Sequence, residues 1–346
     1  MHTHGHIRMA LRFAIVALSA LACFFSGSAL AEEKSDDASV LTYRSNVSEV
    51  RVTFFVTDND ESDHPLETLS KADFAVVDSE RIIRSFRSFG HSDETSLDVV
   101  ALVDLSESVA PRFRTAMNQV LRLVAREQSI GDDNISVLSF GGNRGGILRG
   151  SGDTRASDTA PAILCADGCR SPDAMVSLSS AQAGGATPLY DALIFASDFI
   201  AQRRRDSVRP VVILFSDGAD TISLHSRGEA LAAVCEAGAL IYSVDLGTSK
   251  PQELRRDSYF ISGGVFLRQV SEASGGRYFS FPQGGSQLDA GATVLNAALD
   301  DLRASFVVTY DLPSREAGFH SLRILPTHNR KLTFHSRNGY DYEPSR

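Results

Sequence analysis

Two long apolar runs constrain the fold of this chain more than any other feature. Val99–Val103 and Val211–Phe215 each contain five consecutive apolar residues. A strand that is apolar on both sides is typical of a parallel sheet with both faces covered. Helix-like and strand-like patterns alternate across residues 96–303, so the sequence predicts an α/β domain with a doubly wound, mostly parallel sheet.

Strand-like segments also flank this region on both sides. Val50–Thr57 and Phe306–Tyr310 are rich in β-branched and aromatic residues. Neither flank is long enough to bury a core alone. We therefore expect residues 46–95 and 304–346 to pair into one small β-sandwich beside the α/β domain.

The polar stretch between residues 150 and 180 is expected to form an insertion or a long loop. A hairpin before it would lead to a short edge strand at Ile147–Leu148. Cys165 and Cys169 can close a small disulfide loop in an oxidising compartment, whereas a zinc site would need more ligands. Cys235 lies in an apolar context and is expected to be a buried small side chain.

The first 31 residues have the pattern of a secretory signal peptide. Arg8 and Arg12 supply its positive region, and Phe13–Phe25 is apolar but too short to span a bilayer. Small residues precede a cleavage site after Ala31. The prediction is a secreted or periplasmic protein.

Two alternatives remain at this end of the chain, an uncleaved anchor and lipidation at Cys23. Residues 32–45 are polar and are expected to be disordered. No later segment is apolar enough to cross a membrane, so no membrane span is expected after signal cleavage. The formal net charge of −9 argues against nucleic acid as a partner.

Five oxygen-bearing side chains follow a pattern that points to one site. Asp104, with Ser106 and Ser108 after it, ends the first apolar run, and Asp217 closely follows the second. Thr187 precedes a helix-like segment. Because parallel strands place their carboxyl ends at one edge of a sheet, we expect these side chains to converge there.

Oxygen-only ligands suit a hard divalent cation, Mg²⁺ or Mn²⁺. Two carboxylates and three hydroxyls do not fill an octahedral shell, which leaves a position for water or for a partner's carboxylate. The alternative is that these residues cap helices and turns without a metal.

In these motifs the chain resembles the von Willebrand factor A-type (VWA) domain, over about residues 97–300. The matching segments are Asp-Leu-Ser-Glu-Ser, Gly-Gly-Ala-Thr-Pro-Leu-Tyr-Asp-Ala, Leu-Phe-Ser-Asp-Gly, Ile-Tyr-Ser-Val-Asp-Leu-Gly and Ser-Gly-Gly-Arg-Tyr-Phe. The flanks resemble a secreted bacterial branch of that family. The resemblance implies a metal-ion-dependent adhesion site (MIDAS) formed by Asp104, Ser106, Ser108, Thr187 and Asp217. The extra alanine at position 186, directly before Thr187, departs from the Gly-Gly-Thr sequence that is commonest in this motif.

The sequence therefore favours a divalent-cation-dependent protein-binding module of the adhesion type, whose partner offers an acidic side chain. One alternative is a structural envelope component in which the metal only stabilises loops. A metal-dependent hydrolase is disfavoured, because no Gly-x-Ser-x-Gly motif or histidine base accompanies the serines, and we expect no enzymatic activity. Glu107 and Asp220 lie close to the motifs and are expected to be solvent-exposed.

Overall fold

A computed structural model describes residues 49–58, 64–94, 96–126, 134–142, 160–205, 207–247, 263–280 and 290–344. The expected signal peptide with Cys23, the polar segment 32–45 and the expected strand at Ile147–Leu148 lie outside these residues. None of the helices in the described ranges is both long and apolar enough to cross a membrane.

The centre of the α/β domain is a six-stranded sheet in the order β10-β9-β8-β5-β6-β7. Neighbouring strands run parallel except β7, which pairs antiparallel with β6 at one edge. The strands are β5 (Ser96–Asp104), β6 (Ile135–Phe140), β7 (Ala162–Ala166), β8 (Val208–Ser216), β9 (Leu240–Asp245) and β10 (Tyr278–Ser280).

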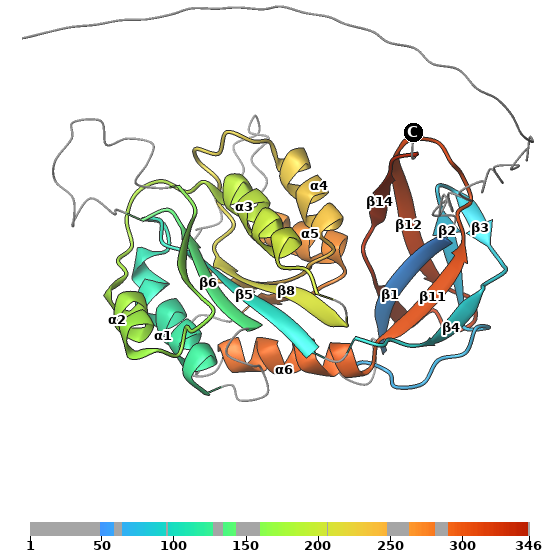
Figure 1. Cartoon of the computed structure of the whole chain (residues 1–346), viewed down its shortest axis with the longest axis horizontal. Helices are drawn as coiled ribbons and strands as arrows, with labels where there is room; N and C mark the ends of the chain where they lie inside the picture. Colours follow the sequence, from blue (N-terminus) through green and yellow to red (C-terminus); the bar gives the residue numbers. More distant parts are fainter. Residues whose placement is uncertain are drawn as a thin grey trace, which may run out of the picture. The chain divides into compact units, whose positions relative to one another are not determined.

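Helices cover both faces of this sheet (Figure 1). One face packs against α1 (Ala110–Arg126), α2 (Pro172–Ser180) and α6 (Ala290–Arg303), and the other against α3 (Leu189–Gln202), α4 (Arg227–Ala237) and α5 (Gly263–Ser274). Alternate residues of β5 enter the two cores, Ala101 on one side and Leu102 on the other. The doubly wound, mostly parallel sheet predicted from the sequence is confirmed.

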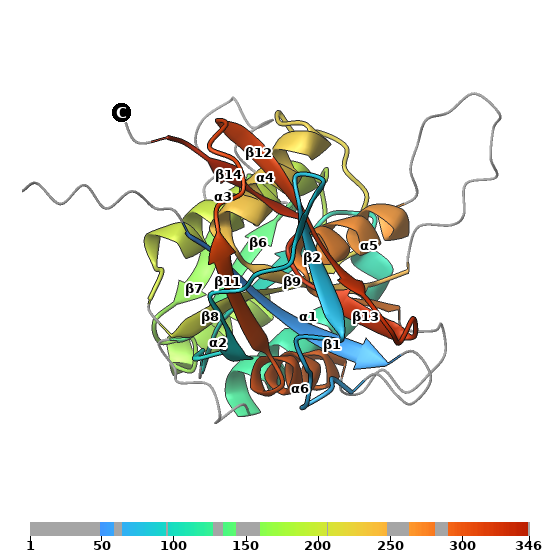
Figure 2. The ribbon, with the colours of Figure 1, turned by 90° about the vertical axis from the view of Figure 1, so that its right-hand side faces the viewer.

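Two antiparallel four-stranded sheets form the flanking β-sandwich. Their orders are β13-β1-β11-β4 and β14-β12-β2-β3. The strands from the N-terminal flank are β1 (Glu49–Asp58), β2 (Phe74–Asp78), β3 (Arg81–Ile83) and β4 (Ser88–His91), and those from the C-terminal flank are β11 (Phe306–Asp311), β12 (Gly318–Pro326), β13 (Leu332–His335) and β14 (Gly339–Tyr342). Figure 2 shows β1 beside β11, the pairing in which Val52 faces Val308.

Both sheets therefore combine strands from the two flanks, which alternate in the first sheet and meet at the β12–β2 pairing in the second, and all share one core. Within it the rings of Phe54 and Phe74 meet edge-on with centroids 5.4 Å apart. The chain leaves the sandwich after β4 and re-enters it at β11. At this crossing the amide of Ser92 donates a hydrogen bond of 2.8 Å to the carbonyl of Ser305.

The expectation of a long loop across residues 150–180 is wrong in its second half. This stretch contains edge strand β7 and helix α2, and Cys165 of β7 forms a disulfide with Cys169. Helix α2 begins at a hydroxyl cap from Ser171 and buries only Leu178. A helix with one buried apolar residue lacks the repeating apolar stripe that identifies helices in a sequence.

The turn after α5 lies tightly against the segment between β13 and β14. Gly275 has φ of +84°, and a Cβ there would lie 2.6 Å from the backbone carbon of Ser336. Nearby, the amide of Asn338 donates to the carbonyl of Ala273 at 3.0 Å, and the buried thiol of Cys235 contacts the Asn338 side chain. This packing joins the α/β domain to the sandwich.

We predict that Gly275→Ala lowers the free energy of unfolding by about 2 kcal/mol, because the substitution adds both backbone strain and a steric clash. Chemical denaturation measures the change. Gly238→Ala is the matched control, since Gly238 also has a positive φ (+65°) but a Cβ there would meet no atom within 4 Å. Its cost should be about 1 kcal/mol from backbone strain alone. Equal losses in the two variants would contradict the proposed clash.

Candidate functional site

The two candidate aspartates lie at the point where the order of the central sheet reverses. Asp104 is the last residue of β5, and Asp217 directly follows β8. These two strands are parallel neighbours, with Val103 opposite Phe215. Because β6 continues the sheet on the other side of β5, the loops after β5 and β8 frame the crevice in which open α/β sheets bind ligands.

Asp104 is fully buried, and both of its carboxylate oxygens accept hydrogen bonds. The backbone amide of Ser106 donates to Oδ1 at 2.8 Å, and the hydroxyl of Ser216 donates to Oδ2 at 2.7 Å. In the same loop the hydroxyl oxygens of Ser106 and Ser108 lie 3.0 Å apart. Ser106 is buried and Ser108 is exposed, so this pair extends from the buried carboxylate to the surface.

Burial raises the pKa of Asp104 to about 6, even though the hydrogen bonds from Ser106 and Ser216 act in the opposite direction. The charge of Asp217 raises it further, so the two carboxylates lie close enough to repel each other. Asp217 itself is 1% exposed. A cation placed between the two carboxylates would offset this repulsion.

Backbone hydrogen bonds attach the loop that carries Thr187 to the loop after β5. The amide of Gly184 donates to the carbonyl of Leu105 at 2.7 Å, and the amide of Glu107 donates to the carbonyl of Gly185 at 3.0 Å. Reciprocal bonds of this kind fix the spacing of two loops without help from side chains. Glu107 is exposed, as the sequence predicted.

A second pair of bonds attaches Thr187 to the loop after β8. Its amide donates to the hydroxyl of Thr221, and its carbonyl accepts from the amide of Thr221, each at 2.8 Å. Thr187 is 2% exposed. The three loops are therefore adjacent, and the extra residue Ala186 does not move Thr187 away from the other two.

Gly141 supports this arrangement from the end of β6. Its φ is +69°, and a Cβ there would lie 2.9 Å from the amide nitrogen of Ser106 and 3.1 Å from the carbonyl oxygen of Ala186. Only glycine leaves room for the two loops to approach so closely. Sequence reasoning treated this glycine as part of a turn and missed its role at the site.

Ser216 is the other residue that sequence reasoning missed. Its hydroxyl donates to Asp104 and accepts from the amide of Gly218 at 3.0 Å, so it links the ends of β5 and β8. The sequence contains a usable signal, because a hydroxyl at the last position of a buried apolar strand needs a polar partner.

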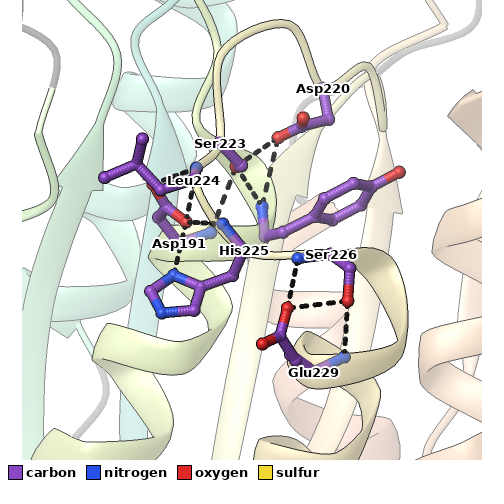
Figure 3. Close-up of polar contacts among 8 residues, drawn as sticks. Asp191, Asp220, Ser223, Leu224, His225, Ser226 and Glu229 are labelled. Atoms are coloured by element: carbon purple, nitrogen blue, oxygen red, sulfur yellow. Dashed lines mark hydrogen bonds and ion pairs between the residues drawn. The ribbon is translucent and has the colours of Figure 1, made fainter.

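The loop from Asp220 to Ser226 is held against the start of α3 by side-chain caps (Figure 3). Asp220 accepts from the amide of Tyr190 at 3.2 Å and from the hydroxyl of Ser223 at 2.5 Å. It is half-buried, so the expectation that it is solvent-exposed is wrong. The cause is local, since a carboxylate can satisfy the free amides at the start of a helix.

Asp191 fixes the other side of this loop. Its carboxylate accepts from the amides of Leu224 and His225 at 3.0 to 3.1 Å, and one of its oxygens lies 2.8 Å from Nδ1 of His225. Burial favours a higher pKa for Asp191, but these hydrogen bonds outweigh it and lower the pKa. The loop thereby presents the side chain of Leu224, which is 93% exposed, from a fixed backbone.

No family model and no curated protein matches the chain. Similar solved structures include proximal thread matrix protein 1 from the mussel byssus (13% identity, 60% of this chain and 49% of that chain, TM-score 0.40). Another is an aerotolerance-related membrane protein from Bacteroides fragilis (14% identity, 58% of this chain and 98% of that chain, TM-score 0.39). A third is a manganese-loaded TRAP protein from Plasmodium vivax (15% identity, 78% of this chain and 100% of that chain, TM-score 0.37). The chain thus spans about half the length of the mussel protein.

The sheet order, its antiparallel edge strand and the motif positions agree with the resemblance found in the sequence. Because its sequence motifs resemble those of the VWA family, this α/β domain is called the VWA-type domain. Within the described ranges, the VWA-type domain and the sandwich contain no group of three or more histidine, cysteine, aspartate or glutamate side chains arranged to hold a metal. The site at the end of β5 instead offers two carboxylates together with hydroxyl groups.

We predict that Asp191→Asn destabilises the VWA-type domain near neutral pH, and that this destabilisation shrinks as the pH falls below about 3.8. The folded-state pKa of Asp191 is lowered, so its contribution is present above the unfolded value near 3.8 and is lost as the pH falls through the lowered folded value. Thermal unfolding of both proteins across this pH range measures the difference. Asp198→Asn, an exposed change on the same helix, is the control. A destabilisation that stays constant down to pH 3 would contradict the assigned role of the carboxylate.

Proposed function

We propose that the VWA-type domain binds a divalent cation, Mg²⁺ or Mn²⁺, and through it an acidic side chain of a partner protein. Asp104, Ser106, Ser108, Thr187 and Asp217 are the residues that would hold the ion. The observation that carries this proposal is the set of hydrogen bonds that brings their three loops together at the switch point of the sheet.

The donor chemistry fits a hard cation. All five side chains offer oxygen, and the repulsion between Asp104 and Asp217 favours a positive charge between them. A bound cation would supply an attachment point for a carboxylate from outside. Ser108 is exposed, so a partner can approach the site from that side.

Leu224 gives the proposed partner surface a second contact. It lies in the loop whose residue Thr221 is bonded to Thr187, and Asp191 holds its backbone in place. Exposed apolar side chains on a preorganised backbone are effective anchors at interfaces, since little conformational freedom is lost on binding. The partner that fits carries an apolar side chain near its acidic residue.

Two other functions use the same residues differently. A structural envelope protein would bind the cation and no partner, so a partner screen separates it from the leading proposal. A hydrolase would need a general base beside a serine, and in the described part of the chain the hydroxyls of Ser106 and Ser108 are bonded to each other and not to a histidine. We therefore propose a binding protein without catalytic activity, acting outside the cytoplasm after signal cleavage.

Mg²⁺ or Mn²⁺ is expected to raise the melting temperature of the protein, and Asp104→Asn and Asp217→Asn should each abolish this rise. At a cation concentration of 100 times Kd, the stabilisation of the folded state is about 2.7 kcal/mol. Differential scanning fluorimetry with and without a chelator measures the shift. Asp198→Asn, an exposed charge removal on α3, should retain the full shift. A shift that survives both site variants would rule out the proposed ligands.

Leu224→Ser is expected to weaken capture of the partner without changing the cation-induced shift. A pull-down from native envelope or culture material, with Mg²⁺ or with chelator, gives the comparison. Val176→Ser is the control, because Val176 is also exposed (67%) but lies on α2. Capture that is unaffected by Leu224→Ser would show that the loop is not part of the interface. Capture that is unaffected by the chelator would contradict the metal-dependent proposal itself.

A further inference from the structure

A cavity of about 410 Å³ lies at the amino end of β8, the end opposite to Asp217. The VWA-type domain contributes Arg204 and Arg209 to its lining, and the sandwich contributes Arg337 and Tyr340. Its size falls in the range of pockets for small organic ligands. Nothing in the proposed metal site uses these residues.

Arg209 places an unused donor in this lining. The side chain is 4% exposed, its Nε is bonded to Glu94, and its Nη1 donates to the hydroxyl of Ser305 at 2.6 Å. Its Nη2 is buried and has no hydrogen-bond partner among the described residues. Because this atom is closed off from solvent, it does not itself reach a ligand in the cavity, but the positive charge of Arg209 lies in the cavity wall.

Arg204 and Arg337 add charge that is not balanced locally. Neither has a carboxylate within ion-pair distance in the described part of the chain. Arg337 instead donates to the backbone carbonyl of Arg51 at 3.2 Å and lies over the ring of Tyr340. Burial lowers the pKa of Arg337, and the charge of Arg204 acts in the same direction, which places the two guanidinium groups close together.

The acidic residues of the lining only partly offset these charges. Glu94 is bonded to Arg209, and Glu49 lies 3.5 Å from Arg87, which is outside the cavity lining. Asp341 is exposed to solvent. The guanidinium groups of Arg204 and Arg337 therefore remain available to a ligand.

We propose that this cavity binds a small organic molecule carrying an oxyanion, either a phosphate or a carboxylate, held by Arg204 and Arg337 and favoured by the charge of Arg209. The planar guanidinium fork matches both groups in geometry and charge. Tyr340 and Leu312, both half-buried in the lining, suit the organic part of the molecule.

Isothermal titration calorimetry with phenyl phosphate and with benzoate tests the proposal on the full mature chain. We expect saturable binding of at least one probe, and at least a tenfold loss of affinity in Arg204→Gln and in Arg337→Gln. Arg204 is exposed, so its substitution leaves the packing intact even if Arg337→Gln disturbs the fold. Arg330→Gln removes an equal charge from an exposed residue outside the cavity and should bind like the wild type.

Preference for phenyl phosphate would identify the ligand group as a phosphate, and preference for benzoate would identify a carboxylate. The proposal is overturned if neither probe binds at 5 mM, a concentration about five times a millimolar Kd. It is also overturned if Arg330→Gln weakens binding as much as Arg204→Gln does. Asp104→Asn should leave this binding unchanged, which separates the outcome from that of the metal proposal.

Discussion

A single buried carboxylate organises the functional edge of this protein. Asp104 ends the central strand of the sheet, is fully removed from solvent, and accepts hydrogen bonds from its own loop and from the end of the neighbouring strand. A charged group in such a place costs free energy unless donors surround it. The loops after β5 and β8 supply those donors, and for that reason their conformations depend on each other.

The remaining contacts of the site extend this dependence outward. Thr187 is bonded through both its amide and its carbonyl to Thr221. Asp220 of the same loop accepts from an amide at the start of α3, and Asp191 of α3 accepts from the amide of Leu224 in the loop. The path from the buried carboxylate to the exposed Leu224 therefore consists largely of hydrogen bonds to backbone groups. A surface supported in this way is rigid before any partner arrives, which reduces the entropy lost on binding.

The sequence allowed the sheet, its two helix layers and the pairing of the two flanks into a sandwich to be predicted, because long apolar runs and periodic helices carry strong signals. It did not reveal β7 or α2, since α2 buries only Leu178 and has no apolar stripe. The five candidate site residues were identifiable from strand ends and hydroxyl spacing. Ser216 was missed although a hydroxyl at the end of a buried strand needs a polar partner. Gly141 was not identifiable, because its importance comes from which loops approach it in three dimensions. The exposure of Asp220 was misjudged for the same reason.

The hydrogen bond between Ser92 and Ser305 has a mechanical consequence. It joins the segment by which the chain enters the VWA-type domain to the segment by which it leaves, so the two ends of that domain are held together. Tension applied through the residues before Glu49 and after Tyr342 reaches β1 and β14 first. The load would then fall on the sandwich, and the loops of the candidate site would stay unstretched until its strands came apart.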